Sequence, residues 1–348
     1  MGMRHHSKRG YVLITAGLCS IAVLGILGLA VDLGRLYIVK SEIQAFADSA
    51  ALAAALELDG TATGVTRAAN AVAANPNRWD LASTTFSGTQ VDFATSSSGP
   101  WQANPLPAAD YRFARVRASG AVPLYLLPAV GTPSSATMQA AAIAAQVLDA
   151  SFSEGVFPFS PFSHNSAPPD FGYTPGVHYT LRWGAGFKPC VGDDDPAWIA
   201  QAQAGGSDER GYIEVTSADI IRQAIEQDYQ SFTITVGSPV TMTGGNKQTQ
   251  RDSLVNRVNQ DTDTLSATYA DYAASGTGNG RRLVAAAVNS GHPDNIVLGI
   301  GLFFLLTPSE YPNGGGKPFC AEYVGPYVQG SRHKGASDAG GYVVRLVQ

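Results

Sequence analysis

The sequence has few charged residues: Asp, Glu, Lys and Arg make up only 15% of its 348 residues, well below the ~25% of ordinary soluble domains. Basic residues number 23 against 28 acidic ones, which gives a formal net charge of -5. So little charge excludes a highly charged disordered chain. The lack of a cationic excess argues against nucleic acid as a partner. Together with 45% hydrophobic residues, this composition favours a membrane or extracytoplasmic protein.

Motifs for catalysis and metal binding are also missing. The six histidines show no metal-ligand spacing, and no Gly-x-Ser-x-Gly nucleophile elbow occurs. The Gly-rich segment 276–282 lacks the Gly-Lys-Ser/Thr of a phosphate loop and precedes a predicted strand, so it predicts a turn. The three aspartates 193–195 lack the rest of a calcium loop and predict a solvated turn. We therefore expect no enzyme activity, no cofactor and no metal ion.

One long uncharged stretch is present, residues 11–31. As a helix, its 21 residues would span ~30 Å, the hydrocarbon thickness of a bilayer. Lys8 and Arg9 precede it directly, so the positive-inside rule places a basic head, residues 1–10, in the cytoplasm and the chain after Asp32 on the other side. The alternative is a cleaved signal peptide, whose apolar region is shorter, ~7–15 residues. No turn dipeptide of the Asp-Gly or Gly-Pro kind follows the stretch until Asp59-Gly60. The sequence therefore predicts a retained anchor.

The anchor is expected to be the first part of one helix over residues 11–58. In its second half, apolar side chains recur on one face at helical spacing, which predicts packing on a folded body or on another subunit. The residues of this face are Ile43, Ala47, Ala50, Ala51, Ala54 and Leu58. Asp32 and Arg35, three residues apart, can meet where the helix leaves the lipid. They are interpreted as an interfacial ion pair or as a docking point for partner helices.

The N-terminal segment resembles the TadG-like (TadE/TadG-type) proteins of the Tad, or Flp pilus, assembly system. The resemblance covers roughly residues 8–75 and depends on a basic-Gly start, an apolar helix, an Asp-x-x-Arg pair, a Gln and an Ala-Asp-x-Ala-Ala-Leu-Ala run. In this sequence these are Arg9-Gly10, Asp32, Arg35, Gln44 and residues 47–53, which include Asp48. The resemblance implies a single membrane helix with a pilus-accessory body outside the cytoplasm. The implied partners are other pilus-assembly or pseudopilin proteins and the inner membrane, with Gln44 and Asp48 on a family-specific helix face.

Two departures from the family pattern limit which family properties can be expected of this sequence. Prepilin-type members are cut after a Gly and carry a Glu five residues into the mature chain, whereas cleavage after Gly10 would put Thr15 there. Larger members carry a von Willebrand A-like insert with an Asp-x-Ser-x-Ser metal motif, which is absent here. The sequence therefore predicts neither processing as a pilin subunit nor metal-dependent adhesion.

The remainder of the chain predicts an α+β protein in two periplasmic units. Residues 60–150 are expected to form a small α/β unit, although 136–148 fits a helix or a strand. The Pro-rich segment 151–172 is interpreted as a linker, and 173–348 as a β-rich α+β domain. Predicted helices there cover 217–229 and 250–260. Predicted strands are 179–183, 232–236, 283–288, 296–306, 321–328 and 342–347. The apolar run 296–306 would form a helix of only ~16 Å, so a buried strand is expected instead of a second span.

The three cysteines fall into two groups. Cys19 lies within the apolar stretch and is expected to be an apolar filler. Cys190 and Cys320 lie in the exported body, where an oxidising compartment favours a disulfide. The alternative is two unpaired thiols. Pairing would enclose 129 residues. The loss of loop entropy in the unfolded chain would then stabilise the folded state by ~3–5 kcal/mol.

The preferred hypothesis is a non-catalytic, single-pass assembly component of a bacterial Tad pilus system, with its N-terminus in the cytoplasm and its body in the periplasm. An anchored ligand-binding module is the main alternative. It would require an exposed aromatic cluster, for which Trp183, Trp198 and residues 157–162 are the candidates. An envelope enzyme is the least favoured alternative.

Overall fold

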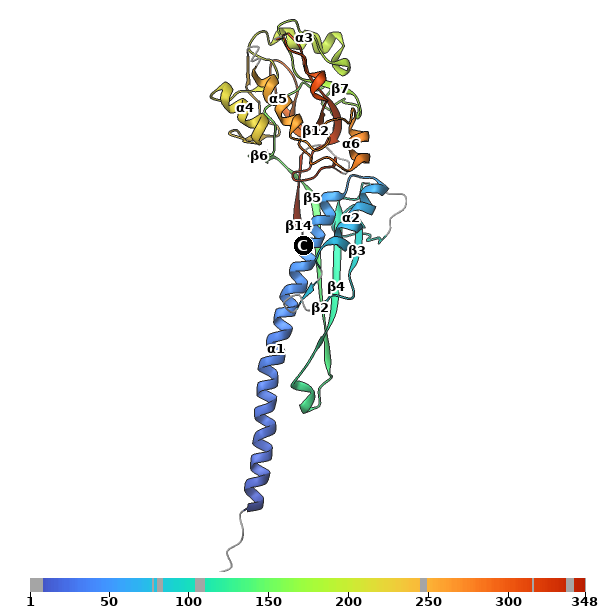
Figure 1. The fold of residues 1–348 in the computed structure, drawn as a ribbon, viewed down its shortest axis with the longest axis vertical. Helices are drawn as coiled ribbons and strands as arrows, with labels where there is room; N and C mark the ends of the chain where they lie inside the picture. Colours follow the sequence, from blue (N-terminus) through green and yellow to red (C-terminus); the bar gives the residue numbers. More distant parts are fainter. Residues whose placement is uncertain are drawn as a thin grey trace, which may run out of the picture.

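The computed structural model describes residues 9–76, 78–79, 84–103, 110–244, 249–314, 316–335 and 341–347. Most of the predicted basic head lies outside this set. The predicted α+β class with a long N-terminal helix is confirmed. The molecule is elongated, with the free end of the helix at one end and the C-terminal body at the other (Figure 1).

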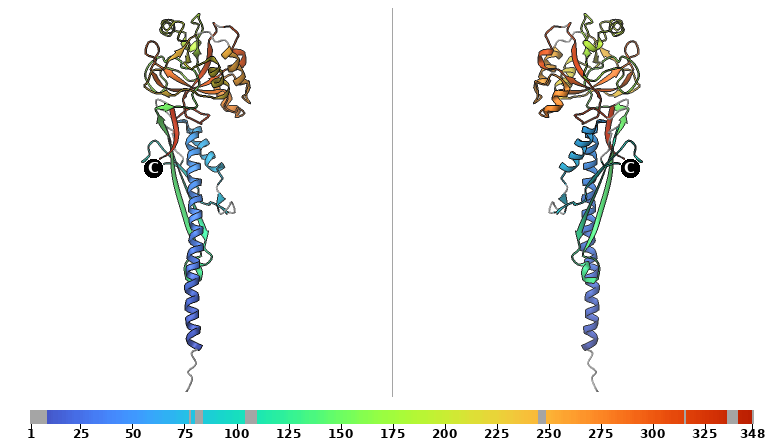
Figure 2. Two further views of the ribbon diagram at one scale, coloured as in Figure 1. Left: turned by 90° about the vertical axis from the view of Figure 1, so that its left-hand side faces the viewer. Right: turned by 90° about the vertical axis from the view of Figure 1, so that its right-hand side faces the viewer.

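Helix α1 (Arg9–Glu57) has 49 residues and changes its surroundings along its length. Most side chains between residues 11 and 31 are exposed, although they are apolar. Further along, Ile43, Ala47, Ala50 and Ala54 are completely buried. The expected apolar face therefore packs inside the protein, while the first part of α1 projects beyond the folded body (Figures 1 and 2).

The second half of α1 packs on an antiparallel sheet with the strand order β14-β5-β4-β3. The strands are β3 (Gln90–Ala94), β4 (Phe113–Pro123), β5 (Ser135–Asp149) and β14 (Gly341–Val347). Alternate residues of β4 and β5 are buried, among them Val116 and Ala144. Small side chains on both surfaces permit close approach of helix and sheet. Helix α2 (Ala62–Ala74) and the short pair β1 (Arg78–Trp79) and β2 (Thr84–Thr85) complete this unit.

The ambiguous segment 136–148 is a strand, within β5. It pairs with β4 from Phe113↔Ala145 to Pro123↔Ser135. This long hairpin runs beside α1 toward its free end (Figure 1). Between the strands lies a short 3-10 helix, η1 (Leu127–Val130). Alanine is a good helix former, and the local preference of this segment is therefore for a helix. Pairing with β4 and burial override that preference and make the segment a strand.

The C-terminal body is built on a second antiparallel sheet with the order β11-β12-β13-β7. Its strands are β7 (His178–Arg182), β11 (Leu283–Asn289), β12 (Val297–Leu305) and β13 (Phe319–Pro326). The run 296–306 is the expected buried strand, β12. Around the sheet lie helices α3 (Pro196–Ala204), α4 (Ala218–Gln227), α5 (Thr249–Asn259) and α6 (Tyr269–Ser275). The short elements are β6 (Ser151–Phe152) paired with β9 (Ile234–Thr235), β8 (Tyr212–Ile213) paired with β10 (Met242–Thr243), η2 (Val191–Asp193) and η3 (Pro308–Glu310).

Two parts of the chain differ from the sequence-based division. Strand β14 was expected inside the domain 173–348, but it pairs with β5 and so completes the sheet under α1. The segment 151–172 was interpreted as a linker, yet its Phe159 and Phe162 are completely buried in the body. Its prolines lack N–H groups and prevent a regular strand. Two of the remaining N–H groups bond to β11, Phe157 to the Ala285 carbonyl and Ser163 to the Asn289 carbonyl.

Candidate functional site

The carboxylate of Asp32 holds the tip of the β4–β5 hairpin against α1. It accepts hydrogen bonds from the backbone N–H groups of Tyr125 (3.0 Å), Leu126 (3.0 Å) and Leu127 (2.8 Å). Asp32 has no exposed surface, and bonds from N–H groups to a charged acceptor are stronger than neutral ones. This carboxylate therefore fixes where the hairpin meets the helix.

Arg35, the second member of the predicted pair, also contacts the hairpin. Its Nη1 donates to the Pro123 carbonyl at 3.0 Å, and its guanidinium carbon lies 4.1 Å from the centre of the Tyr125 ring. Such stacking of a cation on an aromatic face is attractive. Both residues thus contact the β4–β5 hairpin of the same chain, and docking of partner helices at this place stays a prediction.

Gly28 lies one helical turn before Asp32 and is packed against the same hairpin tip. A Cβ atom at this position would lie 3.2 Å from the Leu126 Cβ and 3.3 Å from the Leu127 nitrogen. A larger residue here would push the hairpin away from α1. Gly28, Asp32 and Arg35 thus lie on one side of the helix and contact one hairpin.

Gln44 and Asp48 lie further along α1. The Gln44 amide donates to Asp48 Oδ1 at 2.8 Å and to the Ala141 carbonyl at 3.3 Å, and Lys40 donates to the Gln139 carbonyl. Within the described residues strand β14 pairs with β5 from residue 143 onward, and these side chains bind β5 before that point. Lys40 and Gln44 also line an open groove of about 590 Å³ beside β4 and β5.

The C-terminal end of α1 is tied to both folded units. Gln146, buried in β5, donates to the carbonyls of Ala55 (2.9 Å) and Leu58 (2.7 Å). Ser331, which follows β13, donates to the Leu56 carbonyl at 2.7 Å. These carbonyls are among the groups that a helix leaves unpaired at its end. The last turn of α1 is therefore fixed to the first sheet and to the body together.

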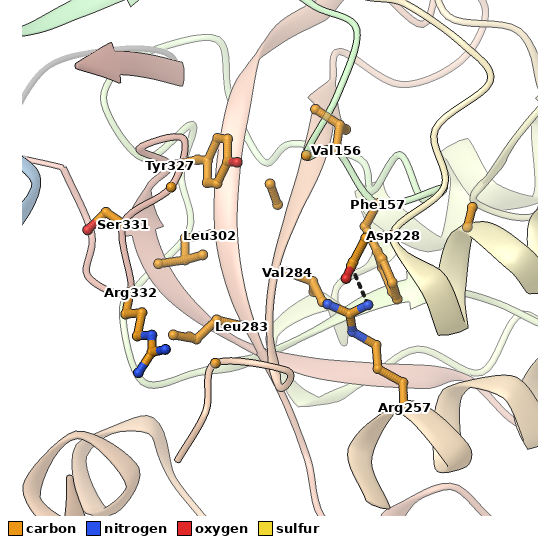
Figure 3. A pocket seen from close by; sticks show the side chains of 15 residues that line it. Val156, Phe157, Asp228, Arg257, Leu283, Val284, Leu302, Tyr327, Ser331 and Arg332 are labelled. Atoms are coloured by element: carbon orange, nitrogen blue, oxygen red, sulfur yellow. Dashed lines mark hydrogen bonds and ion pairs between the residues drawn. The ribbon is translucent and has the colours of Figure 1, made fainter. Parts of the chain in front are cut away.

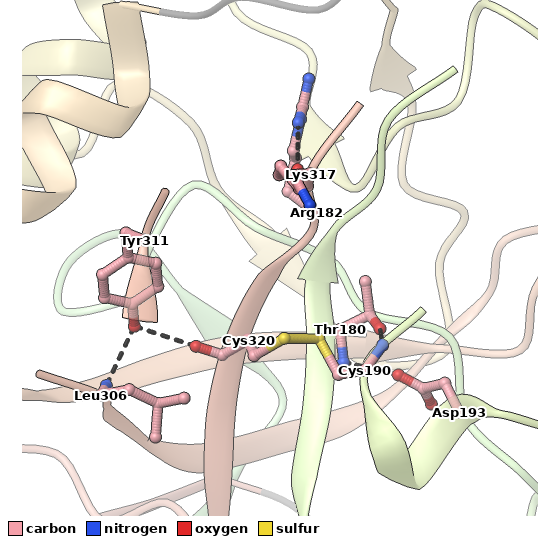
Figure 4. Close-up of a disulfide and its surroundings, with 8 residues drawn as sticks. All are labelled: Thr180, Arg182, Cys190, Asp193, Leu306, Tyr311, Lys317 and Cys320. Atoms are coloured by element: carbon pink, nitrogen blue, oxygen red, sulfur yellow. Dashed lines mark hydrogen bonds between the residues drawn. A yellow bond between two sulfur atoms is a disulfide. The ribbon is translucent and has the colours of Figure 1, made fainter. Parts of the chain in front are cut away.

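Cys190 and Cys320 form the expected disulfide, with their Cα atoms 5.8 Å apart (Figure 4). Cys320 lies in β13, and Cys190 lies at the end of the loop that follows β7. The Cys190 N–H donates to Thr180 Oγ1 at 2.8 Å, and the Cys320 carbonyl accepts from the Tyr311 hydroxyl at 2.9 Å. Cys19 is a free, exposed thiol on α1.

Asp193, beside this disulfide, corrects one sequence-based expectation. The triplet 193–195 predicted a solvated turn, but Asp193 is only 1% exposed. His164 Nε2 lies 2.9 Å from its Oδ1, and the Thr180 N–H donates to its Oδ2. The hydrogen bond with Asp193 raises the pKa of His164, and burial raises the pKa of Asp193. Asp195 caps α3 through the Trp198 N–H. Among the described residues no group of three or more His, Cys, Asp or Glu side chains could hold a metal ion.

The aromatic residues that the ligand-binding alternative would need on the surface form part of the core. Phe162 and Trp183 are completely buried and Trp198 is 3% exposed. Their ring centroids are 4.7 Å (Phe162–Trp183) and 5.4 Å (Trp183–Trp198) apart. Tilted and edge-to-face aromatic rings of this kind stabilise an interior, so these residues are not available to a ligand.

The body also contains a cavity of about 130 Å³ beside β11 and β12 (Figure 3). Phe157, Leu302 and Tyr327 line it, together with Arg257, whose Nη1 lies 2.5 Å from Asp228 Oδ1. Small-molecule sites usually measure ~300–1,000 Å³. This cavity is too small for a typical ligand.

The length and composition of α1 are sufficient to cross a membrane, and the apolar window is almost entirely exposed on the protein. The class that fits is a single-pass membrane-anchored protein with an α+β body. Residues 10–57 match the model of the Tad family, the TadE/G-like proteins of Flp pilus assembly. The match covers α1 and confirms the resemblance seen in its sequence. No curated protein and no solved structure matches the chain.

Proposed function

We propose that the protein is a non-catalytic assembly component of a Tad (Flp) pilus system, anchored in the inner membrane by α1 with its body in the periplasm. The observation that carries the proposal is the family match on a helix whose first half is apolar and exposed. Proteins of this family assemble pili, so other pilus-assembly or pseudopilin proteins are the proposed partners.

The polar atoms within the apolar stretch support its placement in lipid. The Thr15 hydroxyl donates to the Tyr11 carbonyl at 2.8 Å, and the Ser20 hydroxyl donates to the Ala16 carbonyl at 2.8 Å. In a bilayer, polar groups without internal partners are costly. Both hydroxyls therefore have hydrogen-bond acceptors within the helix and need no water.

The proposed mechanism is mechanical. Helix α1 is continuous from Arg9 to Glu57, and its last turn is bonded to Gln146 and Ser331. A displacement of the membrane-embedded part would therefore reach both folded units directly. The disulfide in the body supports export, because such bonds persist in oxidising compartments.

We expect the anchor to be necessary for pilus formation as well as for export. A strain in which residues 1–31 are replaced by a cleavable export signal should secrete the body and make no pili, because the body loses its position and its mechanical link. Pili are counted by electron microscopy. The matched control replaces only residues 11–24 by an unrelated apolar helix of the same length and keeps Gly28 and Asp32. It should make pili. Normal piliation with the soluble body would show that the segment serves export alone.

A further inference from the structure

The tip of the β4–β5 hairpin, residues 124–134, is uncharged and partly exposed, and its first half is apolar. It begins Leu-Tyr-Leu-Leu-Pro-Ala-Val, and no charged residue occurs between Ala118 and Leu148. Tyr125 is 64% exposed, and Ala129 is also exposed. Among the residues that the structure describes, this loop at the far end of a long hairpin lies beside α1 and away from the C-terminal body (Figure 1). The exposed side chains of the tip therefore face the surroundings of the protein.

The level of the tip along α1 indicates what those surroundings are. Gly28 contacts Leu126 and Leu127, and it lies 17 residues beyond Tyr11. At 1.5 Å per residue this is ~26 Å, within the ~30 Å of hydrocarbon that the apolar stretch is proposed to cross. The tip therefore lies beside the last turns of the lipid-facing part of α1. A bilayer around these turns would also surround the tip.

The backbone of the tip is suited to an environment without water. Asp32 accepts three of its N–H groups. The Leu124 N–H bonds to the Ser134 carbonyl, the Ala129 N–H to Leu126 and the Gly131 N–H to Pro128. Pro128 and Pro133 have no N–H group. Loops exposed to lipid are costly because unpaired backbone groups cannot find water, and here the donors named have acceptors.

Aromatic and basic side chains mark the same boundary. Tyr125 on the tip and Tyr37 on α1 are both exposed, 64% and 77%, and Arg35 stacks on Tyr125. Tyr11, also 77% exposed, lies 26 residues before Tyr37, or ~39 Å along a helix. This matches a bilayer with its interfacial layers, ~40–45 Å, where tyrosine is enriched.

We propose that the hairpin tip inserts into the interfacial layer of the membrane leaflet on the body's side, as a second lipid contact beside α1. The occupant of this apolar surface is lipid. The inference rests on the proposed anchoring of α1. With two contacts, α1 and the tip, the whole protein can neither spin freely about the axis of α1 nor tilt freely in the membrane.

The test uses the full chain with its disulfide intact, reconstituted in phosphatidylcholine and phosphatidylglycerol vesicles. A nitroxide spin label is attached at one site at a time, and its collisions with oxygen and with a water-soluble nickel chelate are measured. The tip site is Ala129→Cys in a Cys19→Ala background. The matched control is Leu148→Cys, exposed at the other end of β5 and ~43 Å from its start. The natural Cys19 reports the depth of α1.

We expect nickel collisions several-fold lower at residue 129 than at residue 148, with Cys19 the most protected site. If residue 129 is as accessible as residue 148 while Cys19 is protected, the inference is overturned and the anchor stands. A tip reserved for a protein partner would give this same aqueous result, because no partner is present. If Cys19 itself is accessible to nickel, the anchor fails and the inference fails with it.

Discussion

Replacing Asp32 by leucine is expected to release the hairpin tip from α1. Three backbone N–H groups then lose a charged acceptor that leucine cannot replace. Since one hydrogen bond to a charged group contributes ~1.5–3 kcal/mol, amide exchange in residues 124–134 should accelerate by roughly tenfold to a hundredfold. Hydrogen exchange with mass spectrometry on the detergent-solubilised full chain measures this directly.

Asp48→Leu is the matched control for this change. It also replaces an aspartate of α1 by leucine, but Asp48 is only half-buried and its contact is with Gln44 on the same helix. Exchange at the tip should stay at the wild-type rate. Unchanged exchange at the tip in Asp32→Leu would contradict the assigned role of this carboxylate.

Removing the disulfide is expected to destabilise the body strongly. The bond joins residues 130 positions apart, and closing so long a loop in the unfolded chain stabilises the folded state by ~3–5 kcal/mol. Cys190→Ser and Cys320→Ser should therefore each lower the free energy of unfolding by about this amount. Denaturant titration gives the value, and limited proteolysis should show faster cleavage of the body.

A measurement of membrane insertion distinguishes a loss of stability of the body from general misfolding of the protein. Both serine variants should remain in the membrane fraction, because α1 is untouched, and Cys19→Ser should leave the denaturation midpoint unchanged. Unaltered stability of Cys190→Ser would mean that the core alone holds the sheet together and that the bond contributes little.

Local sequence patterns were sufficient to predict α1, α4, α5 and the central strands. The Ala-rich face of α1 is periodic, and β12 is bounded by Pro293 and Pro308. The disulfide could be predicted because the body is expected in an oxidising compartment and contains an even number of cysteines. Each of these features depends on neighbours in sequence or on a simple count.

The remaining features depend on contacts between distant residues. The spacing links Asp32 to Arg35, but it gives no indication of the three N–H groups, 93–95 residues away, that donate to the Asp32 carboxylate. Strand β14 crosses back to β5, and no pattern within residues 341–347 indicates which sheet it joins. In the segment 151–172, the prolines indicated a linker, while the burial of Phe159 and Phe162 depends on pockets formed by later parts of the chain. The sequence around Asp193 likewise predicts a solvated turn, because its contact with His164, 29 residues away, cannot be read from that segment.

The central claim is that α1 is retained whole as a membrane anchor for a body on the periplasmic side. The most direct measurement is the intact mass of the protein from the membrane fraction after alkaline extraction, combined with a reporter fused after residue 60. We predict a mass that includes residues 11–31, resistance to extraction and a periplasmic signal from the reporter. A soluble protein that begins near residue 32 would contradict the account.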